Sequence, residues 1–159
     1  MIDGIDKKIL TILQSNARTS NAEIARSVGL VPSATLERIR KLEKQGAILG
    51  YQAHLNPRFT NLGLLAFVFV KTAENFSEQK TGESLGAIPE VQEVHHVAGE
   101  DCYLVKVRAA STEAMGRLLR DQFGAIPTVI STQTTIVLET VKESSQLPLT
   151  AICEDQNHE

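Results

Sequence analysis

Basic and hydroxyl side chains are concentrated in residues 32–45 of the chain. Arg38 and Lys41 are three positions apart, so they share one face of a helix, and Ser33 and Thr35 lie near its N-terminus. Such an N-terminus can dock a phosphate, arginine prefers guanine, and a carboxylate can accept a hydrogen bond from cytosine N4. We therefore predict that this helix binds double-stranded DNA. The predicted contacts are Asn21, Ser33, Thr35, Glu37, Arg38, Arg40, Lys41 and Lys44.

The net charge of -3 hides an asymmetry between two parts of the chain. Residues 1–58 hold nine Lys or Arg and five acidic residues, whereas the remainder holds seven basic and fourteen acidic residues. A basic first part joined to an acidic second part suggests a polyanionic partner for the first part only. Chance clustering of charge and a solvated charged helix face are the alternatives that stay open at this point.

Histidine and cysteine side chains offer a second kind of chemistry. His95 and His96 are adjacent in an expected strand, so they point to opposite faces and cannot chelate one metal together. Cys102 could approach one of them across the turn centred on Glu100, and a Cys–His pair would suit zinc or another soft metal. Ordinary sheet residues are the better interpretation of this pattern, and we predict no metal site.

The sequence has no glycine loop of the kind that cradles phosphates and no cluster of histidine ligands. We therefore expect no enzyme, no catalytic residue and no cofactor. The longest apolar run, residues 64–70, is far shorter than the roughly 20 residues of a membrane helix. The acidic N-terminus lacks a signal core, and two cysteines cannot form a disulfide framework. A cytoplasmic protein that does not bind membranes is expected.

Three helices are expected over residues 3–45. Apolar residues recur at helix spacing, Asp3 can cap the first helix, and an acidic residue three positions on can complete a capping box. Gly29 ends the second helix, and Pro32 suits the first turn of the third. The short turn between these two helices has the length found in a helix-turn-helix. Residues 48–53 form an extended segment, as a wing or the start of a linker.

From residue 62 the apolar spacing becomes that of strands. The expected strands cover residues 64–72, 91–97, 102–109 and 130–141, and the expected helices cover 76–87 and 112–123. This order predicts an α+β protein whose second domain has the ferredoxin-like βαββαβ fold. Helices leave one face of such a sheet uncovered, so a homodimer or a larger oligomer is expected. The expected boundaries are 1–50 for the helix-turn-helix domain, 51–61 for a hinge, 62–149 for the ferredoxin-like domain and 150–159 for a flexible tail.

These residues resemble the leucine-responsive regulator and asparagine regulator (Lrp/AsnC) family of bacterial and archaeal transcription factors. The matching segments are residues 2–3, 18–21, 38–43, 46–48, 56–57, 89–91, 103–104 and 147–148. The resemblance implies transcription regulation by a winged helix-turn-helix joined to a RAM-like or ACT-like domain of ferredoxin-like fold. It also implies dimers that assemble further, for example into octamers, with an amino-acid effector at an interface between dimers.

The chain departs from this family at two places. Relatives commonly have Gly-Asp-aromatic-Asp-Tyr in a turn that helps to hold the effector, whereas residues 99–103 read Gly-Glu-Asp-Cys-Tyr. Val31 stands where relatives carry the serine that caps the recognition helix, and Ser33 could take over that role. The predicted effector contacts are Gly99, Glu100, Asp101, Cys102, Thr132 and Thr134. The two threonines share a strand face, although threonine is also common in strands generally.

Four other functions stay open on the sequence. The chain could be an architectural DNA-binding regulator without an effector, or a sensor that responds to metals or thiol oxidation through Cys102. It could be an amino-acid sensor that does not contact DNA, which the basic first part argues against. The fourth alternative is a haem-precursor decarboxylase, since sirohaem decarboxylases share this architecture, but their haem-handling motifs are not found here.

Overall fold

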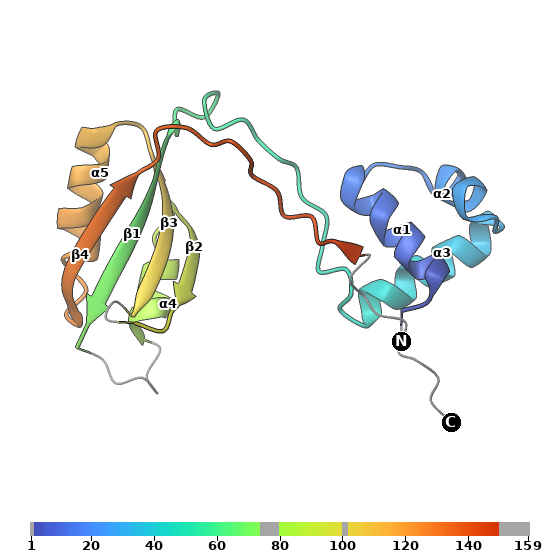
Figure 1. Cartoon of the computed structure of the whole chain (residues 1–159), viewed down its shortest axis with the longest axis horizontal. Helices are drawn as coiled ribbons and strands as arrows, with labels where there is room; N and C mark the ends of the chain where they lie inside the picture. Colours follow the sequence, from blue (N-terminus) through green and yellow to red (C-terminus); the bar gives the residue numbers. More distant parts are fainter. Residues whose placement is uncertain (1, 74–79, 100–101, 150–159) are drawn as a thin grey trace. The chain divides into compact units, whose positions relative to one another are not determined.

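The computed structural model describes residues 2–73, 80–99 and 102–149. The chain divides into two compact units, one made of Met1–His54 with Glu143–Glu159 and the other of Leu55–Lys142. Figure 1 labels the helices and strands of both units. Among the described helices, none is both long enough and apolar enough to span a bilayer.

The first unit contains three helices, as the sequence predicts. They are α1 (Gly4–Ser15), α2 (Asn21–Val28) and α3 (Pro32–Lys44). The side chain of Asp3 accepts hydrogen bonds at the start of α1 and completes a capping box with Asp6, and Ser20 does the same for α2 with Glu23. Gly29 ends α2 with a positive φ of 74°, which a residue without a Cβ adopts readily. Their buried core consists of Ile9, Leu10, Ile24, Ile39 and Leu42.

Two expectations for the first unit are not met. The N-cap of α3 is Val31, whose side chain cannot accept a hydrogen bond, and Ser33 lies inside the helix rather than taking over the cap. Of the two alternatives for residues 48–53, the wing is not formed, because these residues contain no strand, and the irregular backbone fits the start of a linker. An isolated extended segment has no ladder partner to stabilise it. Over residues 2–54 and 143–149, the first unit is therefore a helix-turn-helix with an uncapped α3 N-terminus and no strand.

The second unit is a four-stranded antiparallel sheet with helices on one face. Its elements are β1 (Leu64–Thr72), α4 (Lys80–Gly86), β2 (Val91–His96), β3 (Tyr103–Ala109), α5 (Thr112–Leu118), a π-helical turn (Leu119–Phe123) and β4 (Val129–Ile136). The strand order is β2-β3-β1-β4, which is the ferredoxin-like topology. The predicted order of strands and helices is thus confirmed.

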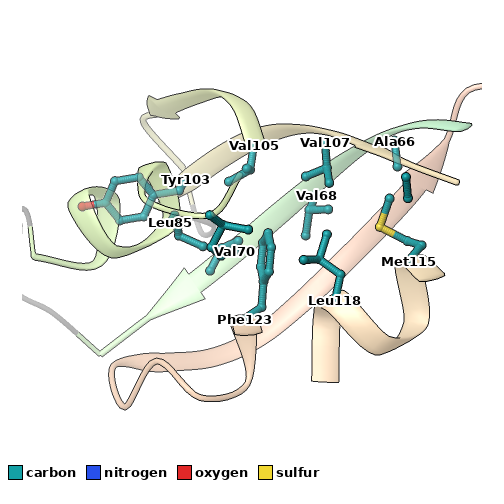
Figure 2. Packing of buried hydrophobic residues seen from close by; sticks show 12 residues of the cluster. Ala66, Val68, Val70, Leu85, Tyr103, Val105, Val107, Met115, Leu118 and Phe123 are labelled. Carbon is teal, nitrogen blue, oxygen red and sulfur yellow. The ribbon is translucent and has the colours of Figure 1, made fainter. Parts of the chain in front are cut away.

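One face of this sheet carries the core. Alternate residues of β1 and β3, among them Val68, Val70 and Val105, are fully buried and pack against Leu118 and Phe123, as Figure 2 shows. The residues between them point to the opposite face, which is lined by Phe67, Phe69, Leu104, Lys106 and Arg108. These five side chains are only half-buried. The sheet therefore has the uncovered face that the sequence predicts.

Element boundaries differ from the sequence prediction mainly in the last strand. β4 ends at Ile136, which pairs with Ala66, and one further backbone hydrogen bond joins the Val137 N–H to the Leu65 carbonyl at 2.9 Å. Beyond this point Leu138 is 98% exposed, so the apolar residues that suggested a strand to 141 have no neighbouring strand to pair with. The expected helix at 76–87 is described only from Lys80, and the expected tail at 150–159 lies outside the described residues.

The C-terminal segment of the described chain belongs to the first unit. The sequence placed residues 143–149 in the sheet domain, but here they group with the three helices. Leu149 packs against the core of the helix-turn-helix, whose members include Ile9 and Leu42. Nothing in the local sequence pattern of residues 143–149 indicates this docking.

Candidate nucleic-acid interface and effector region

The exposed side of α3 carries most of the predicted DNA contacts. Ser33, Glu37, Arg40 and Lys44 recur at intervals of four, three and four residues, so they form one stripe along the helix. Lys41 borders this stripe, and all five residues are exposed. We call these five residues the exposed stripe. Asn21, the sixth exposed residue of the predicted set, begins α2.

Thr35 does not belong to such a surface. Its side chain is fully buried, and its hydroxyl donates a hydrogen bond to the Val31 carbonyl at 3.2 Å. The prediction that Thr35 contacts DNA is therefore corrected. Thr35 lies on the buried face of α3, together with Ile39 and Leu42. Its side chain is small enough to pack there, and the hydrogen bond to the backbone satisfies its hydroxyl.

Arg38 is directed toward α1 rather than along the exposed stripe. One guanidinium nitrogen, Nη1, lies 2.6 Å from Asp3 Oδ2 and 2.8 Å from Asp6 Oδ1. These two carboxylates also form the capping box of α1, since the Asp6 and Ile5 N–H groups donate to Asp3 and the Asp3 N–H donates to Asp6. Arg38 thereby ties the middle of α3 to the first turn of α1, which is a positioning role, and its base contact stays a prediction.

Electrostatics support this ion pair. The Asp6 N–H and the Arg38 guanidinium hold the pKa of the Asp3 carboxyl below its ordinary value of 3.8. The hydrogen bonds that Arg38 donates, first to Asp3 and then to Asp6, raise the pKa of Arg38. The Asp6 side chain is 12% exposed and that of Asp3 is 50% exposed, so the contact with Asp6 is the better shielded from water. The sequence predicted both aspartates as caps but gave no sign that they share a cation from α3.

Of the predicted effector residues, the structure describes Gly99, Cys102, Thr132 and Thr134. Gly99 is exposed and has a φ of 146°, while Glu100 and Asp101 lie outside the described residues. Cys102 is half-buried; its N–H donates to the Val70 carbonyl at 3.0 Å, and its carbonyl accepts from the Val97 N–H at 2.9 Å. The Cys102 backbone is thereby held beside the last residues of β1.

Thr132 and Thr134 flank the other side of β1. They pair with Val70 and Val68, so they share a face, as predicted, and it is the helix-covered face of the sheet. Thr132 is exposed and Thr134 is half-buried. Because β1 lies between β3 and β4, two strand spacings of about 5 Å separate Thr132 from Cys102. The described residues of the predicted site therefore lie on both sides of β1, with Thr132 beside Val70 and Thr134 beside Val68.

The remaining chemistry-bearing residues are structural. His95 pairs with Leu104 on the uncovered face and lies 3.2 Å from Glu93, whereas the His96 ring stacks on Tyr103 with centroids 4.9 Å apart. The predicted opposite orientation of the two histidines is thus confirmed. Within the described ranges, no three His, Cys, Asp or Glu side chains gather as metal ligands.

Residues 82–86 read Gly-Glu-Ser-Leu-Gly, which matches the Gly-x-Ser-x-Gly pattern of some hydrolases. A Gly-x-Ser-x-Gly nucleophile elbow requires a sharp turn from a strand into a helix. Here Ser84 is an exposed residue inside α4. Gly82 has a packing role instead, because a Cβ on it would lie 2.9 Å from the Tyr103 ring.

Comparison with protein families matches both units. Residues 2–43 match the AsnC-type helix-turn-helix domain, and residues 65–147 match the Lrp/AsnC ligand binding domain. The leucine-responsive regulatory protein of Escherichia coli K12 is 40% identical over 149 residues, which cover 92% of this chain and 90% of that protein.

Solved structures give the same result. A transcriptional regulator of Neisseria meningitidis in complex with L-Met has a TM-score of 0.88 and 32% identity, over 94% of this chain and 98% of that one. The feast or famine regulatory protein of M. tuberculosis, complexed with L-methionine, has a TM-score of 0.85 and 33% identity, over 92% and 99%. E. coli AsnC has a TM-score of 0.85 and 27% identity, over 93% and 99%. The chain belongs to the Lrp/AsnC family of DNA-binding transcriptional regulators.

Proposed function

We propose that the exposed stripe of α3, together with Asn21, enters the major groove of the DNA that this regulator controls. The observation that carries this proposal is the alignment of Ser33, Glu37, Arg40 and Lys44 on one exposed face. Arg40 would read guanine, Glu37 would accept from cytosine N4, and Lys41 and Lys44 would contact phosphates. The N-terminus of α3, which no side chain caps, leaves N–H groups available to a phosphate.

The test substitutes Arg40→Ala and measures affinity for duplexes that the wild-type chain selects from a random-sequence pool. A base-reading arginine contributes about 1–3 kcal/mol of discrimination, so we expect a loss of about 5-fold to 100-fold and a relaxed preference at one base pair. Arg117→Ala, which removes the same charge from exposed α5 in the other unit, is the matched control. Equal affinity and sequence preference in the wild type and Arg40→Ala would refute the assignment.

We further propose that the uncovered sheet face joins two copies of the chain. Its centre holds Phe67, Phe69 and Leu104, which a second copy would remove from water. Light scattering should give at least twice the chain mass of 17.4 kDa for the wild type. Phe69→Glu should reduce this to a single chain, while Leu138→Glu, at a position 98% exposed, should not. If Phe69→Glu remains a dimer, the uncovered sheet face is not the interface.

An amino acid is the proposed effector, and the turn at 99–102 is its proposed site. Two solved relatives are complexes with L-methionine, and the family resemblance implies that this turn helps to hold the effector. An effector that favours one assembly over another would reposition the DNA-binding units, provided that it binds the two assemblies with different affinity.

The corresponding test measures both molar mass and DNA affinity with each amino acid, beginning with L-methionine. A ligand that shifts both supports an amino-acid-responsive regulator, and Cys102→Asp, which restores the family's carboxylate, should then strengthen the response. Cys102→Ser is the control, since it adds a polar atom without a charge. A chain that binds DNA but responds to no amino acid would instead be an effector-independent architectural regulator.

A further inference from the structure

The end of α1 holds the C-terminal segment of the described chain by a specific set of hydrogen bonds. The Gln14 side chain contacts both polar groups of the Leu147 backbone: Oε1 accepts from the Leu147 N–H at 2.7 Å, and Nε2 donates to the Leu147 carbonyl at 3.2 Å. In return, Gln146 Nε2 donates to the Gln14 carbonyl at 3.0 Å. Three hydrogen bonds therefore join residues 133 or 132 positions apart in sequence.

The position of Gln14 in α1 explains why it is available for this contact. It lies in the last turn of the helix, where carbonyl groups lose their intrahelical partners. The Arg18 N–H, which would follow in a longer helix, bonds to the Asn16 side chain instead. Gln146 satisfies the carbonyl that remains, and Leu149 adds an apolar contact with the helix-turn-helix core.

This attachment is sparse beyond those points. A cavity of about 530 Å³ lies between the C-terminal segment and the helices, bordered by Lys8 and Thr11 of α1 and by Ser27 of α2. All three hydrogen bonds are exposed to water. A segment held by exposed hydrogen bonds and one packed leucine can detach without unfolding the core, since such bonds each contribute only modestly.

Two stretches of chain connect the helix-turn-helix unit to the sheet unit, and they differ in length. Ile48 packs against the helix-turn-helix core, so residues 49–63 connect this unit to β1, and 15 residues can span at most about 50 Å. The hydrogen bonds that fasten the C-terminal segment begin at Gln146, so residues 137–145 connect β4 to the fastened residues, and nine residues can span at most about 30 Å. While residues 143–149 are attached, the second connection limits the separation of α1 from the end of β4. When they detach, only the longer connection remains.

We infer that residues 143–149 are a releasable strap that is fastened at Gln14 and sets how far the DNA-binding unit can reach from the sheet unit. Gln14 and Gln146 are positioning residues for DNA binding in this arrangement. The inference about reach rests on the proposed DNA-binding function, whereas the fastening itself can be measured without DNA.

The fastening is tested by amide hydrogen exchange in the full chain. Gln14→Ala removes both hydrogen bonds to Leu147, so the Leu147 N–H should exchange at least about tenfold faster than in the wild type. Gln146→Ala leaves α1 unchanged and removes one bond, so it should give a smaller increase. Gln52→Ala, an exposed glutamine in the first connection, is the matched control and should give none. Unchanged exchange of Leu147 in Gln14→Ala would overturn the strap, provided that the Ile9 N–H remains protected.

The reach is tested on duplexes with two copies of a half-site selected by the wild-type chain. Lengthening the spacer by one helical turn adds about 34 Å. The wild type should lose at least tenfold in affinity across this step, and Gln14→Ala should lose less than threefold because its strap is released. Identical dependence on spacing in both chains would overturn the inference. If the wild type binds no DNA, the proposed function fails, and the exchange of Leu147 alone decides whether the strap exists.

Discussion

The Arg38→Ala variant tests whether Arg38 positions α3 through Asp3 and Asp6 or contacts a DNA base. The substitution removes contacts of 2.6 Å to Asp3 and 2.8 Å to Asp6. A hydrogen bond to a charged group contributes about 1.5–3 kcal/mol, and an exposed ion pair about 0–1 kcal/mol. Asp6 is 12% exposed and keeps its hydrogen bond from the Asp3 N–H, so we assign its contact about 1.5 kcal/mol. Asp3 is half exposed, and its contact is assigned about 0.5 kcal/mol.

The expected loss of stability is therefore about 2 kcal/mol for the helix-turn-helix unit. Because the chain has two units, native-state hydrogen exchange at the Ile9 and Ile24 N–H groups reports on this unit better than a global melt. Arg40→Ala is the matched comparison, since it removes the same charge from the exposed side of the same helix. It should change these exchange rates little and should weaken DNA binding.

The stability that Arg38 contributes should also depend on pH. The pKa of Asp3 is lowered in the folded chain, so this carboxylate stabilises the fold above its ordinary pKa of 3.8. That contribution is lost as the pH falls from the ordinary value through the lowered one. The difference between the wild type and Arg38→Ala should thus be constant near neutral pH and shrink below about pH 4. If Arg38→Ala leaves exchange at Ile9 unchanged and weakens DNA binding as Arg40→Ala does, the positioning role is refuted.

Three further predictions, each about interactions within one unit, can be tested by thermal or chemical unfolding. Gly82→Ala should destabilise the sheet unit by about 1–3 kcal/mol, because its Cβ would lie 2.9 Å from the Tyr103 ring, whereas Gly86→Ala should be tolerated, since its nearest neighbour is 4.0 Å away. Thr81→Val should reduce the free energy of unfolding by about 1–3 kcal/mol, because the buried Thr81 hydroxyl bonds to the Thr128 hydroxyl at 2.6 Å. Unchanged stability would mean that water takes the place of the Thr81 hydroxyl as the partner of Thr128. Ser20→Ala should cost the helix-turn-helix unit about 1 kcal/mol, and Ser20→Asp should restore it, because either oxygen can cap α2. Equal stability of Ser20→Ala and the wild type would argue against the capping box.

Much of the fold could be predicted because its signals are local. Asp3 and Gly29 mark helix ends through their own side-chain and backbone chemistry, and both were placed correctly. The run of apolar and β-branched residues in Leu64–Thr72 gave β1 its observed bounds. Periodicity likewise separated the buried face of β3 from the uncovered one.

The parts that could not be predicted depend on distant partners. The end of β4 is set by where β1 offers a pairing partner, and apolar residues beyond Ile136 cannot reveal that limit. The partner toward which the Arg38 side chain is directed is set by carboxylates 35 and 32 residues away. The attachment of Leu147 depends on Gln14, 133 residues earlier. A sequence read in short windows holds no information on any of these three contacts.

Helix α1 takes part in two of these three long-range contacts. Asp3 at its N-terminus holds α3 through Arg38, and Gln14, eleven positions later and about 16 Å along the axis, holds the strap. A three-turn helix with a packed face moves as a rigid body, so a pull on the strap displaces α3 without altering the side chains of the exposed stripe. Release of the strap should therefore change where α3 meets DNA and leave unchanged which bases it prefers.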